Sequence, residues 1–259
     1  MKNIFNFLSL LSILFFGVAE IVQAEEINVS AESNSWALSA GESITIYEFS
    51  KSIERSIVLR RLSRFGSIAV EQLHLNRFSS IDKAIAIDAY PLLWSGAYGN
   101  IRYQKSSAIF YPNTSWRAEI FQNIGNGWEL AASHDQLSFS STVMMDGLSI
   151  GKYWGNFYAR FRHQKVSSSV SSGIGNRFMI RYYYLGEADH FFEINASKGT
   201  SGNYATSQIN GSQSDSYGVN WNHYLDRNWG FNFSASQVSD KQNLVIRERN
   251  IGSKLIYRW

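Results

Sequence analysis

The strongest constraint on the fold is a two-residue alternation that recurs in segments of about ten residues. In one such segment the apolar positions are Trp116, Ala118 and Ile120. The positions between them, Arg117 and Glu119, are charged. Because successive side chains of a strand point to opposite faces, the segment has one apolar and one polar face. Comparable segments begin at Trp128, Phe157, Phe178, Tyr217 and Trp229.

The composition indicates that the apolar faces meet lipid. The 259 residues include 17 Phe, 14 Tyr, 8 Trp and 19 Gly but only 2 Pro, and the chain is slightly polar on average. This combination is typical of a membrane barrel with a wet interior and excludes a helical membrane protein. The lack of cysteine excludes disulfides, thiol catalysis and cysteine-based metal sites. A net charge of +3 without a Lys/Arg block argues against nucleic-acid binding.

The connections predict an all-β fold, a transmembrane antiparallel up-and-down β-barrel of about 14 strands. Short turns, as at Gly96 and Gly127, recur at every second connection. Longer polar stretches, Ser167–Gly175 and Thr200–Asp215 among them, lie between the short turns. Outer-membrane barrels have short periplasmic turns and longer outer loops, so we expect both termini in the periplasm. Twelve strands remain an alternative, because the stretch Ile44–His74 alternates poorly.

The positions of the tryptophans support this topology. Most of them fall at the predicted periplasmic rim, where an indole places its ring in the acyl boundary and its N–H among the headgroups. We therefore predict an aromatic girdle at that rim. Its members are Trp36, Trp94, Trp128, Trp154, Trp229 and Trp259.

The amino terminus has the features of a secretory signal peptide. A cationic start precedes an apolar run from Ile4 to Ala19, and Val22-Gln23-Ala24 fits a cleavage site. An uncleaved anchor helix is the alternative, but Glu20 interrupts the run before the roughly 18–20 residues that a spanning helix needs. The predicted segments are a cleaved signal peptide over 1–24, a periplasmic tail over 25–34 and the barrel over 35–259.

The last ten residues alternate as a strand, with Leu255, Tyr257 and Trp259 on one face. The series Asn250, Gly252, Leu255 and Tyr257 resembles the closing-strand signal of bacterial outer-membrane proteins. We therefore predict an assembly signal, which the barrel-assembly machinery would read as a partner. The residues of this predicted signal are Gly252, Leu255, Tyr257 and Trp259.

Five short motifs follow one another through the middle of the chain. They are Asp88-Ala89-Tyr90-Pro91, Phe110-Tyr111-Pro112, Gly127-Trp128-Glu129-Leu130, Gly151-Lys152-Tyr153-Trp154-Gly155-Asn156 and Arg181-Tyr182-Tyr183-Tyr184-Leu185-Gly186. In this order and spacing they resemble the YaiO-type outer-membrane protein family, most clearly over Asp88–Gly202. The resemblance implies an outer-membrane barrel, a fold that in the family is sometimes joined to helical-repeat or polysaccharide-related modules. It supplies no catalytic residues.

Catalytic groups are not evident in the sequence. The adjacent pair His134 and Asp135 would point to opposite faces of a strand and could not bond each other. We expect no catalytic residue, no cofactor and no metal site, because no two histidines share a strand face at two-residue spacing. The five histidines are His74, His134, His163, His190 and His223.

The inward-facing charges are the better functional candidates, because such groups must meet water or each other. About fourteen strands enclose more space than the roughly eight whose interior side chains can fill, which favours a water-filled pore. The arginines Arg160, Arg162 and Arg181 would then favour anionic solutes or acidic polysaccharide. The alternative is a closed lumen in which these arginines pair with Glu129 and Glu193. The predicted pore-lining residues are Arg102, Arg117, Glu119, Glu129, Arg160, Arg162, Arg181 and Glu193, with Asp88, Asp135, Lys254 and Arg258 also inward.

Together these features favour a porin-like passive channel or export conduit for small solutes or a saccharide in the outer membrane of a Gram-negative bacterium. The alternative is a non-conducting structural barrel that binds lipopolysaccharide or a periplasmic partner. A lipid-modifying barrel enzyme is a third hypothesis. Beyond the assembly machinery, the expected partners are outer-membrane lipid, lipopolysaccharide and saccharide or exopolysaccharide components, without nucleic acid.

Overall fold

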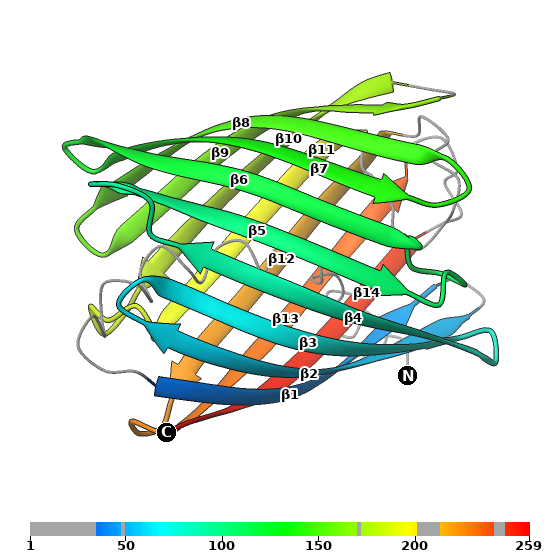
Figure 1. The fold of residues 1–259 in the computed structure, drawn as a ribbon, viewed down its shortest axis with the longest axis horizontal. Helices are drawn as coiled ribbons and strands as arrows, with labels where there is room; N and C mark the ends of the chain where they lie inside the picture. Colours follow the sequence, from blue (N-terminus) through cyan, green and yellow to red (C-terminus); the bar gives the residue numbers. More distant parts are fainter. Residues whose placement is uncertain (1–34, 48–49, 170–171, 201–212, 241–246) are drawn as a thin grey trace, which may run out of the picture.

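The computed structural model is a closed antiparallel β-barrel of fourteen strands (Figure 1). It describes residues 35–47, 50–169, 172–200, 213–240 and 247–259. Within these ranges, no helix is long and apolar enough to cross a membrane. The strands are β1 (Ser35–Ile46), β2 (Lys51–Ser63), β3 (Gly66–Arg77), β4 (Ser80–Pro91), β5 (Ala97–Ser106), β6 (Thr114–Gly125), β7 (Trp128–Ser138), β8 (Thr142–Trp154), β9 (Phe157–Ser168), β10 (Ser172–Tyr183), β11 (Phe191–Thr200), β12 (Gln213–Tyr224), β13 (Trp229–Asp240) and β14 (Arg247–Arg258).

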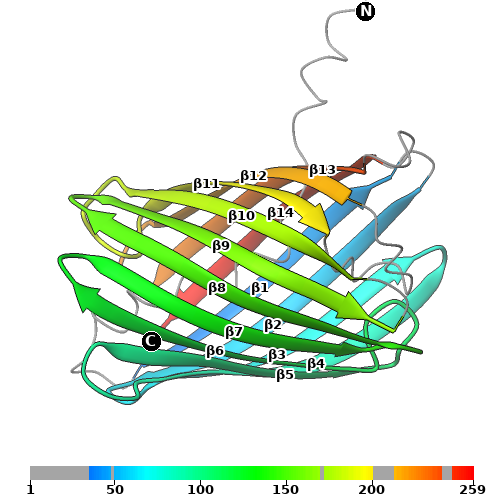
Figure 2. The same cartoon turned by 90° about the horizontal axis from the view of Figure 1, so that it is seen from above.

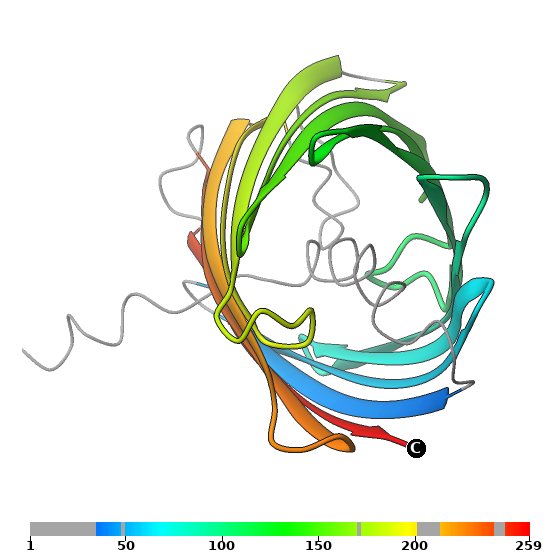
Figure 3. The same cartoon turned by 90° about the vertical axis from the view of Figure 1, so that its left-hand side faces the viewer.

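Each strand pairs with its neighbours in sequence, and β1 pairs with β14 to close the ring. Figure 2 shows the strands inclined to the barrel axis, and Figure 3 shows β1 beside β14 at the seam. The seam places Ala37 opposite Arg258. At its end Trp36 and Trp259 exchange backbone hydrogen bonds of 2.9 and 3.0 Å. Closure satisfies the backbone of both terminal strands, which a bilayer requires of a β structure.

The prediction of fourteen strands is confirmed, and the alternative of twelve is wrong. The stretch that alternates poorly contains all of β2 and most of β3. Its pattern is weak because both faces of β2 are mixed, with cations among the apolar residues outside and apolar residues among the polar ones inside. Arg55 and Arg61 are exposed on the outer surface, whereas Val58 and Leu62 face the interior. A pattern search that assumes an apolar exterior therefore misses this strand.

The two rims of the barrel differ. We call the rim at which β1 begins and β14 ends the terminal rim, and the other the loop rim. Two-residue turns connect β2 to β3, β6 to β7 and β8 to β9 at the terminal rim, whereas the loop rim has one such turn, between β3 and β4. Gly127 in the turn between β6 and β7 has a φ of +73°, and an added Cβ would lie 2.5 Å from the carbonyl oxygen of Tyr153. Only glycine fits this position without strain.

One predicted loop is wrong and several predicted segments lie outside the described residues. The stretch Ser167–Gly175 is mostly strand, because β9 continues to Ser168 and β10 begins at Ser172. Its serines and glycines resemble a loop in the sequence, although Ile174 belongs to the outward apolar row of β10. Most of Thr200–Asp215, the signal peptide over 1–24 and the tail over 25–34 lie outside the described residues.

The outer surface carries an apolar belt. Large side chains such as Ile85, Leu148 and Phe178 are exposed on it, where they can contact acyl chains. The predicted tryptophans lie together at the terminal rim, all exposed, and so form a girdle on one side of the belt. They are Trp36, Trp94, Trp128, Trp154, Trp229 and Trp259.

Candidate functional site in the barrel lumen

The lumen contains a cavity of about 240 Å³. Its walls come from β1 to β7 on one side and from β12 to β14 on the other. Of the predicted pore-lining residues, Arg102 and Arg117 line this cavity, as do the inward-facing Lys254 and Arg258. The other six predicted residues do not line it, because they lie on the part of the wall between β6 and β11 where side chains pack against one another. These six are Glu119, Glu129, Arg160, Arg162, Arg181 and Glu193.

A cluster centred on Arg102 forms the acidic side of the cavity. The Arg102 guanidinium bonds Glu71 at 2.7 Å and Asp88 at 3.2 Å. Asp88 also accepts hydrogen bonds of 2.7 Å from the amide of Asn100 and the hydroxyl of Tyr90. Arg102 is therefore neutralised by two carboxylates, and Asp88 is held in place by three donors. Such a network gives the wall fixed polarity rather than a mobile charge.

Lys254 on β14 presents its ammonium group to the same cavity. It makes no hydrogen bond or ion pair within 4.0 Å among the described residues. Its charged neighbours are Glu54, Glu71, Arg60 and Arg102, so it lies in a mixed field. An ammonium without a direct partner in the protein is favoured by hydration, which fits a lumen that admits water beside Lys254.

The connection between β5 and β6 folds into the lumen at the loop rim (Figure 3). One carboxylate oxygen of Asp82 accepts the backbone N–H groups of Ile109, Phe110 and Tyr111 at 3.0, 2.6 and 2.7 Å. The Tyr111 ring is buried against an apolar cluster that includes Leu73. We call residues 107–113 the inward loop. The loop narrows the lumen, and Asp82 fixes its backbone.

Ion pairs fill the remaining part of the lumen. Arg160 and Arg162 both bond the buried carboxylate of Glu119. Arg181 pairs with Glu193 at 2.9 Å, and both side chains are almost fully buried. Arg181 is therefore neutralised by Glu193, as the alternative of a salt-bridged lumen predicts, whereas Arg160 and Arg162 share one carboxylate.

The expected arginine near Glu129 is Arg160, whose charge acts on the carboxylate. Glu129 also accepts hydrogen bonds from the hydroxyls of Tyr98 and Tyr158, at 2.9 and 2.7 Å. Arg117, another predicted lining residue, pairs with Asp135 at 2.5 Å. The lumen thus combines a salt-bridged half with an open half.

Comparison with known proteins identifies the barrel. A family model described as the YaiO membrane beta barrel domain matches residues 37–204. The chain belongs to the YaiO membrane beta-barrel domain family. The resemblance seen in the sequence is thereby confirmed, and the barrel is located in the bacterial outer membrane.

Solved structures place this YaiO-family barrel among other outer-membrane barrels. The outer membrane protein Omp33 of Acinetobacter baumannii has a TM-score of 0.52 at 8% identity, over 87% of this chain and 99% of Omp33. An anion-selective porin from Comamonas acidovorans has a TM-score of 0.46 at 7% identity, over 88% of this chain and 99% of the porin. The KdgM porin in complex with oligogalacturonate has a TM-score of 0.45 at 9% identity, over 85% and 98%. At these identities the similarity concerns the fold alone. No curated protein matches the sequence.

The histidines of the YaiO-family barrel are not all scattered. His134 and Asp135 do face opposite sides, since His134 bonds Asp146 at 2.6 Å on the outer surface. His190 and His223, however, lie with their Nδ1 atoms 3.2 Å apart. Assigning one histidine to each strand missed this pair, because His190 belongs to the turn before β11 rather than to a strand. Among the described residues no group of three metal-ligating side chains occurs.

The same turn leans over the lumen at the terminal rim (Figure 3). Asp189 bonds the guanidinium of Arg258 at 2.9 and 3.2 Å, and its carbonyl accepts 2.8 Å from the Asn222 amide. Arg258 also lines the cavity. The YaiO-family lumen is therefore narrowed at both ends, by this turn and by the inward loop.

Three acidic residues of the site, Glu54, Glu71 and Asp82, escaped the sequence analysis. Glu54 and Glu71 lie in the stretch that alternates poorly, and the partner of Asp82 is a loop. The available signal was the apolar run Ile109-Phe110-Tyr111 within a predicted connection. Apolar residues in a loop indicate that the loop packs against the protein rather than extending into water.

Proposed function

We propose that this barrel is a passive channel of the outer membrane for small polar solutes, with a saccharide or exopolysaccharide as the preferred class. The observation that carries the proposal is the cavity beside Lys254, which is lined by polar groups from both walls. Arg117 and Lys254 contribute cations, and Asn222 and Asn232 contribute amides. Amide and ammonium donors can replace their hydrogen bonds to water with hydrogen bonds to the hydroxyl and carboxylate groups of a solute. The net change in free energy is small.

The proposal includes an orientation. We place the terminal rim in the periplasm and the loop rim outside, with residues 1–24 removed as a signal peptide. The tight turns and the tryptophan girdle of the terminal rim support this orientation. The inward loop would then be the first constriction that an incoming solute meets.

One observation favours a second candidate, a non-conducting structural barrel that binds lipopolysaccharide or a periplasmic partner. Glu119, Arg160 and Arg162 form a buried cluster, and the Arg181–Glu193 pair is buried further along the wall. If side chains also close the space beside Lys254 in the membrane, no solute passes.

Single-channel recording separates the two candidates. The protein is the chain without residues 1–24, refolded in detergent, shown to be folded by its heat-dependent gel mobility, and inserted into a planar bilayer. Discrete and reproducible conductance steps are expected. Addition of an acidic oligosaccharide should reduce the current more than an equal concentration of its neutral counterpart. Silence from folded, inserted protein would overturn the channel and leave the structural role.

A further inference from the structure

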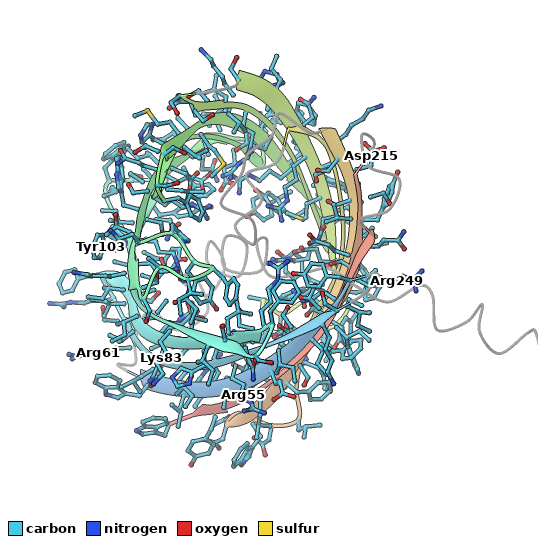
Figure 4. All side chains as sticks on the ribbon, turned by 90° about the vertical axis from the view of Figure 1, so that its right-hand side faces the viewer. Arg55, Arg61, Lys83, Tyr103, Asp215 and Arg249 are labelled. Carbon is cyan, nitrogen blue, oxygen red and sulfur yellow. The ribbon has the colours of Figure 1, made fainter. Side chains whose placement is uncertain are left out.

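The outer surface carries an unbalanced group of cations near the loop rim. The strand register places Arg55 on β2 directly opposite His74 on β3, and His74 directly opposite Lys83 on β4. Lys105 on β5 is one diagonal step from Lys83, because it lies opposite Ile85. We call Arg55, His74, Lys83 and Lys105 the cationic patch. Figure 4, which looks onto the loop rim, places Arg55 and Lys83 on the same side of the barrel.

The patch has little acidic compensation. Glu42 on β1 bonds Arg55 at 2.6 Å, at one end of the patch. The Arg55 side chain nevertheless remains 70% exposed. No acidic side chain faces outward from the described residues of β2 to β5. An exposed guanidinium of this kind can still offer N–H groups to a second anion.

Elsewhere on the outer wall, basic side chains lie beside acidic ones. On β8, Asp146 lies between His134 and Lys165 on the flanking strands. On β12, Asp215 lies opposite Lys198 of β11. There Lys165 and Lys198 each lie opposite a carboxylate on the neighbouring strand, whereas Lys152, near the terminal rim, lies over the Trp128 ring. The accumulation of cations on β2 to β5 is therefore a local feature, not a property of the whole rim.

The depth of the patch identifies the environment of its ligand. On the terminal-rim side of the patch, the same strands expose apolar side chains, among them Ile57, Ile87 and Ile101. Acyl chains cover such residues in a membrane, which would place the patch at the level of the headgroups, with the exposed Ile81 and Phe78 nearer the loop rim. Neighbouring strands are about 4.8 Å apart, and the patch spans roughly 15 Å. This width suits a headgroup with more than one phosphate.

We propose that the cationic patch binds the phosphorylated headgroup of a membrane glycolipid, whose acyl chains lie along the apolar rows of β2 to β5. Arg55 supplies a planar fork for one phosphate, and Lys83 and Lys105 supply point charges for a second. Gln72, which hydrogen-bonds His74 at 3.0 Å, adds an amide within reach of sugar hydroxyls. The site is on the outside of the barrel, so it goes beyond the proposed channel and needs only the orientation given above.

The test is lipid binding by the folded chain in detergent, measured by native mass spectrometry. The probes are bisphosphorylated lipid A, its monophosphorylated form and phosphatidylethanolamine. The triple variant R55Q/K83Q/K105Q should bind lipid A at least roughly tenfold more weakly than wild type. The matched control K165Q/K198Q removes two outward lysines that face carboxylates, and should bind within about twofold of wild type.

Each other outcome has a defined meaning. Equal binding by wild type and the triple variant, or an equal loss in the control, would overturn the patch as a specific site. Displacement of lipid A by an equal concentration of inorganic phosphate would show a site for free phosphate instead. If the triple variant does not fold, K83E, which places an acid at the centre of the patch, is measured in its place and should show the same loss. Because the patch lies outside the lumen, conductance should be unchanged in these variants, so this test is independent of the channel.

Discussion

Tyr111 donates a 2.5 Å hydrogen bond to the carboxylate of Glu54, a residue 57 positions earlier in the chain. Glu54 lies on β2, three strands away from β5, so the bond ties the tip of the inward loop to a separate part of the wall. Asp82 holds the backbone of the same segment through the N–H groups of residues 109–111. The loop therefore has two anchors, and the lumen has the constriction that they define.

Replacing Asp82 with alanine should release the inward loop and raise the single-channel conductance. Alanine removes the acceptor of three backbone N–H groups, and each hydrogen bond to a charged group contributes about 1.5–3 kcal/mol. The control is Tyr111→Phe, which keeps the packed ring and the three N–H bonds and should change conductance much less. Equal conductance of D82A and wild type would show that the loop does not limit the current.

Lys254→Gln should move the reversal potential in a salt gradient toward cation preference. The Lys254 ammonium reaches the cavity without an ion pair among the described residues, whereas Arg102 is bonded by two carboxylates. Loss of the lysine removes a cationic charge from the lumen but no hydrogen bond to the described residues, so stability should change by less than about 1 kcal/mol. Lys254→Arg is the matched control and should keep the wild-type reversal potential. A shift of equal size in both variants would contradict this role.

Glu193→Ala should destabilise the barrel by about 3–5 kcal/mol, because it leaves Arg181 as a buried charge without its carboxylate. The double variant R181M/E193L removes both charges and should recover a large part of that loss. The measurement is equilibrium unfolding in guanidinium chloride, followed by tryptophan fluorescence in micelles. A double variant less stable than E193A would mean that the pair itself stabilises the wall.

Trp259→Ala, or deletion of residues 257–259, should reduce the amount of barrel assembled in the outer membrane. Trp259 stacks on Tyr257, and its backbone closes the seam with Trp36. Trp94→Ala is the matched control, because Trp94 is exposed at the same rim but lies in a turn far from the seam. Membrane fractions probed by immunoblotting give the comparison. Wild-type amounts of the truncated protein would exclude the assembly signal.

Asp226, in the turn between β12 and β13, should titrate below its ordinary pKa of 3.8. The backbone N–H groups of Trp229 and Asn228 donate to its carboxylate at 2.7 and 2.8 Å and stabilise the charged form. Because the folded-state pKa is lowered, the carboxylate stabilises the turn above pH 4 or so, and this contribution is lost as the pH falls through the folded-state pKa. Carbon-detected NMR of the carboxyl group measures the midpoint. A midpoint at or above the ordinary value would contradict these bonds.

The sequence was sufficient for the class of fold, the strand number and the direction of most side chains. The alternation of Trp116, Arg117 and Glu119 determines which side chains point outward and which point into the lumen, because a strand has only two faces. It was insufficient at β2, where Arg55 lies on the outside. Outward residues at the level of the polar headgroups can be charged, whereas outward residues beside the acyl chains are apolar.

The partners within the lumen could not be predicted from the same pattern. Arg160 is on β9 and its partner Glu119 is on β6, so the two meet only because the wall curves. The sequence analysis, which paired residues on nearby strands, predicted Glu129 as an arginine partner. The hydroxyls of Tyr98 and Tyr158 donate hydrogen bonds to the Glu129 carboxylate. Sequence alternation fixes which side a charge faces but not how far around the ring its partner lies.

The seam also dictates an order of events during folding. Across it the amide of Asn250 donates 2.8 Å to the hydroxyl of Thr45, over a separation of 205 residues. Every other strand pair joins neighbours in the chain and can form locally, but this one must wait until β14 is available. Until then β1 has an unpaired edge that can recruit a strand from another chain. Protecting that edge is therefore a requirement for producing the barrel, and folding yield should depend more on β1 and β14 than on any strand between them.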